Sequence, residues 1–373
     1  MKKITLITMQ LKTPGGIERF ISTLANMFVD DYEVEIVSNY GKAGDTLAFP
    51  LNKKVKATFL TEIQPAEVSM KNLITSFKWH LIPSELSRRH EIYTTKDKVF
   101  KNYFKNLETD YIITDRAEYN EIVEKFYTGT AIKIATDHNY HQNNQHYIEV
   151  LMDSIRGFDH LVVATDELKN DYEKLTRVKC HQINNPLDSI PTKKTDLKSK
   201  NLISVGRFVP EKDFETLVDV IAKVHEKDQN IHLTIIGDGI TYPSIKEKVK
   251  KLGLGKVISL PGFLSQKEIE KYYYNSSLFV MTSKTEAFGL VLTEAMSYGL
   301  PCIAFDRASG ARAQIQHKSG VLIPNSNTDL MAFEILRLLN DKDTLKSFQQ
   351  NISGFIDDYS TKNIYSKWSE ILK

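Results

Sequence analysis

The sequence predicts an α/β protein built on two doubly wound parallel sheets. Short apolar runs alternate with helix-like segments through almost all of the 373 residues, which is typical of parallel strands joined by helical crossovers. The series restarts near residue 200, and the chain is longer than a usual single domain. We therefore expect two domains that face each other across a cleft, with ligands bound at the carboxyl ends of the strands.

In the first half, six apolar runs predict strands. They are KITLIT at 3–8, EVEIV at 33–37, YIIT at 111–114, AIKIAT at 131–136, LVVAT at 161–165 and the run at 178–183. We place the N-terminal, acceptor-side domain at 1–190.

The second half contains six further strand-like runs, each followed by Gly, Pro or Asp and most by an amphipathic helix. They are ISV at 203–205, HLTIIG at 232–237, VISL at 257–260, LFVMT at 278–282, PCIAF at 301–305 and GVLI at 320–323. The stretch 184–200 is polar, has two prolines and shows no periodicity, as expected of a connection between domains. We place the linker at 191–200 and the C-terminal, ligand-binding domain at 201–350.

The last segment, 351–373, is expected to be helical. Ile364, Trp368, Ile371 and Leu372 recur at helical spacing and need a surface to cover them. We expect this segment to pack back towards the N-terminal domain.

Composition narrows the class of partner. The 49 basic and 47 acidic residues nearly cancel, so overall charge gives no indication of a nucleic-acid partner. Cys180 and Cys302 are the only cysteines, which argues against a disulfide framework or a structural zinc site. The apolar stretch at the start of the chain is too short for a signal peptide, and no apolar run is long enough to span a bilayer. We expect a cytoplasmic protein, with peripheral contact to the inner face of the cell membrane as an option.

Residues 68–108 form a basic and aromatic region. Eight basic residues stand against four acidic ones, a local net charge of +4, and Phe77, Trp79, Tyr93, Phe100, Tyr103 and Phe104 lie among them. This mixture suits an anionic membrane or a polyanionic acceptor, and a solvated helix face over an ordinary core is the alternative.

The segment 286–294, Glu286-AFGLVLT-Glu294, carries the most information about function. It follows a buried strand-like run and places two carboxylates on either side of an expected strand-to-helix turn at Phe288 or Gly289. The first N–H groups of such a helix attract phosphate or polar sugar groups. Solvated charges at a helix start are the alternative.

Two cations lie at the expected end of another strand. VGRFVPEKDF at 205–214 places Arg207 just after the strand and Lys212 before a helix, where both could hold a diphosphate. In the N-terminal half, TPGGIERF at 13–20 is a Gly-Gly turn into a helix, which suits a bound anion or any tight turn. The dinucleotide and P-loop fingerprints are absent, since Tyr242 stands where GDG at 237–239 would need a third glycine.

His138 follows the strand predicted at 131–136, together with Asp137 and His141. Three polar side chains at a strand end could line a cleft, where an imidazole could contact a hydroxyl group. Metal binding is the alternative, but this grouping lacks a third firm ligand, so we predict no metal site.

Taken together, these landmarks resemble the retaining, nucleotide-sugar-dependent glycosyltransferases of the GT-B fold, family 4 (glycosyl transferases group 1). The resemblance covers about 4–345, is dense over 200–325 and thin over 40–130. It is carried in order by GGIERF, DHN, VGRFVPEKDF, IIGDG, PGFL, the segment 286–294 and GLPCIAFD. It implies two Rossmann-like domains and a nucleotide-sugar donor, with uridine diphosphate as the commonest nucleotide in the family.

The resemblance also implies roles. Glu294 would accept hydrogen bonds from the ribose, Arg207 and Lys212 would hold the diphosphate, Glu286 would hold the sugar, and His138 would lie close to the transferred sugar. Further donor contacts would come from Gly16, Gly262, Phe263, Phe288, Gly289 and Leu290. Beside these cations, the two carboxylates are better assigned to recognition than to general acid and base chemistry.

The implied reaction moves a hexose or N-acetylhexosamine, with retention and without metal or cofactor, to a cell-surface polysaccharide, glycolipid, teichoic-acid-like or protein acceptor. Two departures from the family pattern, Ala287 for Gly and Ala311 for Pro, leave the sugar open. A non-catalytic partner subunit with this fold is the alternative function. A dinucleotide oxidoreductase fits the architecture but lacks its fingerprint.

Overall fold

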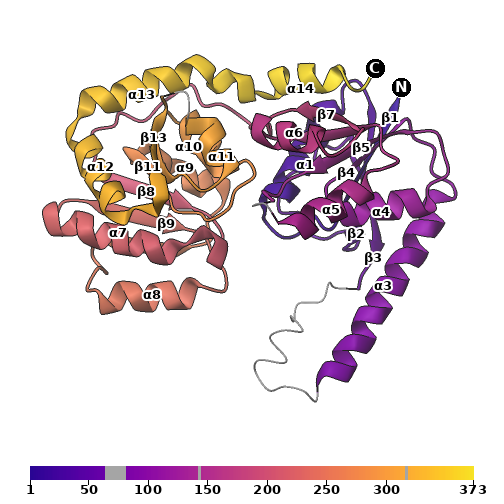
Figure 1. The fold of residues 1–373 in the computed structure, drawn as a ribbon, viewed down its shortest axis with the longest axis horizontal. Helices are drawn as coiled ribbons and strands as arrows, with labels where there is room; N and C mark the ends of the chain where they lie inside the picture. Colours follow the sequence, from indigo (N-terminus) through magenta and orange to yellow (C-terminus); the bar gives the residue numbers. More distant parts are fainter. Residues whose placement is uncertain (64–80, 142–143, 316–317) are drawn as a thin grey trace.

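A computed structural model describes residues 1–63, 81–141, 144–315 and 318–373. It contains two parallel-sheet domains side by side, with the C-terminal helices running across both (Figure 1).

The N-terminal domain is built on a seven-stranded sheet in the order β3-β2-β1-β4-β5-β6-β7, and every pairing is parallel. Its strands are β1 (Lys3–Thr8), β2 (Glu33–Tyr40), β3 (Lys56–Thr61), β4 (Tyr111–Thr114), β5 (Ile132–Asp137), β6 (His160–Val163) and β7 (Lys179–Gln182). Its α-helices are α1 (Gly16–Phe28), α3 (Ile82–Phe104), α4 (Ala117–Phe126), α5 (Gln145–Ser154) and α6 (Asp166–Glu173). The central strands are buried on both faces, which is why they read as continuous apolar runs.

The C-terminal domain has a six-stranded parallel sheet in the order β10-β9-β8-β11-β12-β13. Its strands are β8 (Asn201–Val205), β9 (His232–Ile236), β10 (Ile258–Gly262), β11 (Leu278–Met281), β12 (Cys302–Phe305) and β13 (Gly320–Ile323). Its helices are η2 (Pro210–Lys212), α7 (Phe214–Lys227), α8 (Tyr242–Lys251), α9 (Gln266–Tyr274), α10 (Leu290–Ser297), α11 (Ser309–Ile315), η3 (Pro324–Ser326) and α12 (Thr328–Asn340).

Strand order locates the place for a ligand in each domain. The first strand of each sheet, β1 or β8, pairs with the second strand of its own sheet on one side, and with β4 or β11 on the other. Successive crossovers leave the sheet in opposite directions at this switch point, which opens a crevice at the carboxyl ends of the strands. The loops after β1, β8 and β11 carry Gly16, Arg207 and Glu286.

Strand β3 is the element that the sequence did not predict. It lies at the edge of the first sheet, where β2 is its one partner among the described residues, and its residues are exposed or half-buried. An edge strand of this kind needs no continuous apolar run, because one side and part of each face meet solvent. The twelve strands that were predicted are present, with ends shifted by a few residues.

The C-terminal segment returns to the N-terminal domain. Helix α13 (Lys342–Phe355) spans the expected start of this segment at 351, and η4 (Ile356–Tyr359) leads into α14 (Thr361–Ser369). Ile364 and Trp368 are fully buried in the core formed by α1, β1 and β2, with the Trp368 ring edge-on to Phe28. The chain therefore crosses between the domains twice, once near Leu187 and once near Ser360, and these two crossings form a parallel bridge.

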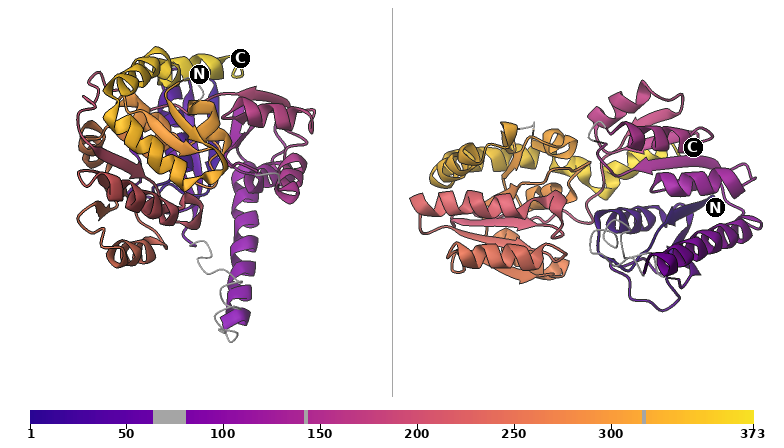
Figure 2. Two further views of the ribbon diagram at one scale, coloured as in Figure 1. Left: turned by 60° about the vertical axis from the view of Figure 1, so that its left-hand side comes forward. Right: turned by 60° about the horizontal axis from the view of Figure 1, so that its bottom comes forward.

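Helix α3 extends from the body of the N-terminal domain (Figures 1 and 2). Phe100 and Phe104 are buried in the domain core, and the buried Lys96 pairs with Glu118. The expected basic and aromatic face is therefore partly core, although Tyr93 is 55% exposed. The part of the region at 68–80, including Lys71, Phe77, Lys78 and Trp79, lies outside the described residues. No helix in the described parts of the chain has the length and apolar character needed to cross a membrane.

Trp368→Ala should destabilise the N-terminal domain by about 3–5 kcal/mol, because it empties a fully buried site. Trp368→Phe should cost clearly less, since the indole N–H has no hydrogen-bond partner among the described residues and a ring still fills the site. Urea unfolding followed by circular dichroism measures both. Equal effects of the two substitutions would contradict the packing role.

Candidate functional site

The two domains enclose a cavity of about 1540 Å³ between the carboxyl ends of their strands. Every site residue predicted from the sequence except Gly262 lines it: Gly16, His138, Arg207, Lys212, Phe263, Glu286, Phe288, Gly289, Leu290 and Glu294. Gly262 has a positive φ of 82° and turns the chain so that Phe263, 60% exposed, follows it. The fold thus gathers residues from the segments that follow five different strands around one space.

The start of α10 is open towards this space. Gly289 occupies the N-cap position with φ of 78°, a backbone conformation that favours glycine, and no side chain caps the helix. The first N–H groups of α10 are therefore free of a side-chain acceptor and carry partial positive charge. The buried amide of Gln314 donates to the carbonyls of Phe288 and Gly289, which holds the turn in place.

The cations after β8 differ in their surroundings. Lys212 forms an ion pair with Glu286, and both side chains are largely buried. Arg207 is exposed to the cavity, and no other side chain in the described residues forms a hydrogen bond or ion pair with it. Gly237 allows this loop to lie against the next one, because a Cβ atom there would come within 1.9 Å of the Gly206 carbonyl oxygen. Arg207 is thus the cation with the greater freedom to meet an anion.

His138 is held as a neutral imidazole. Burial, assisted by the charge of Arg116, lowers the pKa of His138 from 6.5 to about 3. Its Nε2 lies 2.9 Å from the hydroxyl of Thr136, and that hydroxyl donates to the Thr114 carbonyl at 2.8 Å. A hydroxyl has one proton, so Nε2 of His138 must be the donor and Nδ1 keeps its lone pair. His138 can accept a hydrogen bond through Nδ1, but it does not carry charge near neutral pH.

Of the three polar residues in this loop, only His138 lines the cavity. Asp137 is buried behind it, where its carboxylate accepts hydrogen bonds from Tyr147 at 2.5 Å and Tyr172 at 2.8 Å. Burial raises the pKa of Asp137, and the two tyrosines oppose that shift. The buried His141 lies 3.3 Å from Asp171. The expectation that all three residues line the cleft is therefore wrong: Asp137 instead anchors the loop that presents His138.

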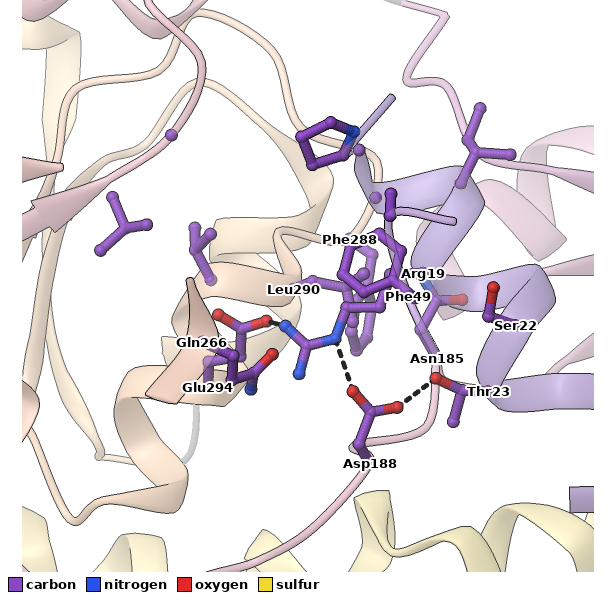
Figure 3. Close-up of a pocket in the computed structure, with 18 of the residues that line it drawn as sticks. Arg19, Ser22, Thr23, Phe49, Asn185, Asp188, Gln266, Phe288, Leu290 and Glu294 are labelled. Carbon is purple, nitrogen blue, oxygen red and sulfur yellow. Dashed lines mark hydrogen bonds and ion pairs between the residues drawn. The ribbon is translucent and has the colours of Figure 1, made fainter. Parts of the chain in front are cut away.

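The carboxylate of Glu294 forms an ion pair with a residue of the N-terminal domain. Its Oε1 pairs with Nη1 of Arg19 on α1, and its Oε2 accepts from the Tyr273 hydroxyl at 3.3 Å. Arg19 also donates from Nε to Asp188 at 2.9 Å, and Thr23 donates to the same carboxylate (Figure 3). Arg19 was not among the site residues predicted from the sequence. Its place in the GGIERF landmark and within an apolar helix face was the available signal, but nothing in the sequence shows which carboxylate it meets.

A second contact between the domains lies on another part of the cleft. Arg312 of α11 forms two hydrogen bonds with Glu167 of α6, at 2.7 and 3.0 Å, and one with the Tyr140 hydroxyl at 3.1 Å. These contacts, together with Asp306, raise the pKa of Arg312. The described residues contain no cluster of three or more His, Cys, Asp or Glu side chains that could hold a metal ion.

The pKa of His138 gives a testable pH dependence of stability. Below about pH 6.5 the unfolded chain binds a proton at this residue while the folded protein does not, so stability falls as pH decreases, by up to about 1.4 kcal/mol per pH unit. His138→Gln removes this term. When the pH is lowered from 7 to 5, the free energy of unfolding of the wild type should therefore fall by about 2 kcal/mol more than that of the variant, as measured by urea unfolding. The exposed His146→Gln is the matched control, and an equal response of both variants would contradict a buried neutral His138.

Comparisons with known proteins agree with this geometry. The sequence profile described as "Glycosyl transferases group 1" matches residues 188–354. An exopolysaccharide phosphotransferase from Streptomyces coelicolor is 25% identical over 99% of this chain and 40% of its own length. The amylovoran biosynthesis glycosyltransferase AmsD from Erwinia amylovora is 33% identical over 47% of this chain and 48% of its own length. The chain thus spans less than half the length of these two relatives.

Solved structures share the whole architecture. A variant of TarM from S. aureus, solved with fondaparinux, α-GlcNAc-glycerol and UDP, superimposes with a TM-score of 0.81 at 18% identity, covering 99% of both chains. The pneumococcal O-GlcNAc transferase GtfA, solved with UDP and GlcNAc, gives a TM-score of 0.78 at 16% identity over 99% of this chain and 98% of its own. Residues 188–354 therefore match the glycosyl transferases group 1 family, within a chain that has the two-domain GT-B fold.

Proposed function

We propose that the protein is a glycosyltransferase that moves a hexose or N-acetylhexosamine from a nucleotide sugar to an acceptor hydroxyl, with retention at the anomeric carbon. One observation carries this proposal. A single cavity is lined by the cations Arg207 and Lys212, by the open start of α10 and by the carboxylates of Glu286 and Glu294. Positive groups suit a diphosphate, and flanking carboxylates suit hydroxyl groups on either side of it.

The donor fits this arrangement in one direction. Glu294 would accept hydrogen bonds from the ribose, with the exposed Phe263 close to the base. Arg207, Lys212 and the first N–H groups of α10 would hold the diphosphate, and Glu286 would hold the sugar. Gly16 lines the same cavity beside Leu290, and its backbone N–H would lie near the phosphates. The UDP in the TarM and GtfA structures supports UDP as the nucleotide.

We propose that the same groups stabilise the leaving diphosphate in place of a metal ion. As the sugar–phosphate bond breaks, negative charge grows on the leaving diphosphate, where fixed cations and helix N–H groups stabilise it. Lys212 has three N–H donors, so one can stay with Glu286 while others face a phosphate. His138 can accept a hydrogen bond from a sugar hydroxyl through Nδ1 without adding charge. The contacts of Arg312 with Glu167 and Tyr140 hold the domains together and limit access of water to the donor.

The acceptor is proposed as a class. A hydroxyl of a cell-surface polysaccharide, glycolipid, teichoic-acid-like polymer or protein would approach from the N-terminal domain, near His138. The α-GlcNAc-glycerol in the TarM structure and the name of AmsD support a glycan or polyol acceptor. We further propose that the protein acts in the cytoplasm, with the exposed Lys98 and Lys101 of α3 facing an anionic membrane or acceptor.

Arg207→Ala should weaken binding of a nucleoside diphosphate about 10-fold to 100-fold, because a charged hydrogen bond to phosphate contributes about 1.5–3 kcal/mol. Binding of the nucleoside without phosphates should change little. Isothermal titration with a panel of nucleoside diphosphates and nucleosides measures this. Arg156→Ala is the matched control, because that side chain is 78% exposed and lies outside the cavity. If no nucleoside diphosphate binds the wild type, the proposed function is wrong.

Glu286→Gln should reduce turnover at least 100-fold, since the lost charge acts on the sugar, while nucleoside diphosphate affinity should not fall, because Lys212 keeps its charge for the phosphates when it loses its carboxylate partner. Turnover is measured by mass spectrometry of products from a donor-by-acceptor screen in the presence of EDTA, and NMR of the product reports the anomeric configuration. Inversion, or activity that requires a divalent metal, would contradict the proposed mechanism. Tight nucleotide binding with no product from any pair would support the non-catalytic alternative.

A further inference from the structure

Arg19 is a nearly buried charge at the boundary between the domains. It lies one turn inside α1, its residue is 9% exposed, and it shares the cavity-lining side of that helix with Ser22 and Thr23. A buried guanidinium is costly unless its N–H groups find charged or polar partners. The identity of those partners therefore shows what holds Arg19 in place.

The partners of Arg19 come from two other segments. Its Nη1 pairs with Oε1 of Glu294 on α10, and its Nε donates to Oδ2 of Asp188 at 2.9 Å, in the chain that connects the domains. Thr23, one turn further along α1, donates to the second oxygen of Asp188. One guanidinium thus joins the N-terminal domain, the connection and the donor-side helix of the C-terminal domain (Figure 3).

The contact with Arg19 leaves room for a ligand on Glu294. A carboxylate offers about four acceptor positions. Arg19 occupies one on Oε1, and the Tyr273 hydroxyl occupies one on Oε2 at 3.3 Å. Two positions remain, one on each oxygen, and the carboxylate lines the cavity. That number matches the two vicinal hydroxyls of a ribose.

Displacement of Arg19 by the ligand is the less favourable course. The side chain would have to leave Glu294 while the interior and Asp188 keep it in place, and a buried charge that loses one partner is strongly destabilised. Neutral ribose hydroxyls cannot replace a carboxylate as the partner of a guanidinium. Glu294 can instead hold Arg19 and the ribose together.

We propose that Arg19 is a positioning residue that orients Glu294 towards the ribose hydroxyls and makes their recognition depend on the arrangement of the two domains. The inference rests on the proposed function, because it takes the ribose of a nucleotide as the ligand of Glu294. Arg19 itself touches neither the sugar nor the phosphates.

A consequence follows from linkage. If the Arg19–Glu294 pair favours ribose binding, ribose binding favours the arrangement in which the pair is formed. Nucleotides with both hydroxyls should therefore stabilise the connection at 184–190 through Asp188, whereas nucleotides that lack them should not.

The test compares UDP with 2′,3′-dideoxy-UDP in the wild type, Arg19→Gln and Glu294→Gln, by isothermal titration. The wild type should prefer UDP by about 100-fold or more, since two hydrogen bonds to a carboxylate are lost with the dideoxy compound. Arg19→Gln should reduce that preference to less than about threefold while its affinity for dideoxy-UDP stays within twofold of the wild type. A variant that carries both Arg19→Gln and Glu294→Gln should lose no more of the preference for UDP over dideoxy-UDP than Glu294→Gln alone. Arg19→Lys should be intermediate.

Other outcomes overturn the inference. Equal weakening of both nucleotides in Arg19→Gln would show a general structural role, and tighter UDP binding would show that Arg19 competes with the ribose. A wild type that binds both nucleotides equally would remove the ribose from Glu294 but leave the diphosphate site, and therefore the proposed function, in place. If neither UDP nor any other nucleoside diphosphate binds, both proposals fail. Should another base be preferred, the ribo and dideoxy forms of that nucleotide replace the UDP pair.

Asp188→Asn keeps the proposal testable if Arg19→Gln does not fold. It leaves the pair with Glu294 in place but weakens the anchor in the connection, so hydrogen exchange at 184–190 should no longer respond to UDP while the preference for UDP over dideoxy-UDP falls only partly. In the wild type, UDP should slow exchange there and dideoxy-UDP should not. Slowing by both nucleotides in the wild type would overturn the coupling.

Discussion

The pairing of Glu294 with Arg19 is the interaction on which the arrangement of the site depends. It joins α10, whose first turn faces the cavity, to α1, which begins at the Gly15-Gly16 turn. Asp188 adds the connection between the domains to the same cluster. A charge buried at a domain boundary needs its partner, so it specifies how the two surfaces meet more strongly than apolar contact would. The pair therefore helps to fix how the two domains that line the cavity face each other.

Two further pairs distribute charge around the cavity. Lys212 with Glu286 places opposite charges at one end, and Arg312 with Glu167 holds the domains on another side of the cleft. Arg207 is exposed between them. Among the described residues, the site thus combines paired charges with an exposed cation, Arg207. Such a framework suits a ligand whose negative charge is concentrated at its centre, because the surrounding groups need little rearrangement when it binds.

Much of the fold could be predicted because parallel strands buried on both faces require continuous apolar runs, and central strands such as β1, β4, β11 and β12 have them. The edge strand β3 does not, since solvent covers one of its sides and part of its faces. The start of α10 was also predictable, because Gly289 before an apolar helix indicates a turn that other residues adopt poorly. The aromatic residues of α3 were compatible with a binding surface or with a solvated face over an ordinary core, because sequence alone does not show which face of a long helix meets the core; Phe100 and Phe104 belong to the core. Asp137 was placed in the cleft for a similar reason: the residues after a strand end can point to either side of the loop.

The sequence by itself determined the two parallel sheets, the loops at their carboxyl ends and the types of side chain in those loops. Local periodicity and glycine positions carry that information, because they reflect the backbone of each segment alone. Only the tertiary structure decided which charges meet. Arg19 and Glu294, or Arg312 and Glu167, lie far apart in the chain and on different domains, and their pairing depends on how the two sheets are placed relative to each other. That placement is set by packing at the domain boundary and by the two chain crossings, which no local pattern encodes.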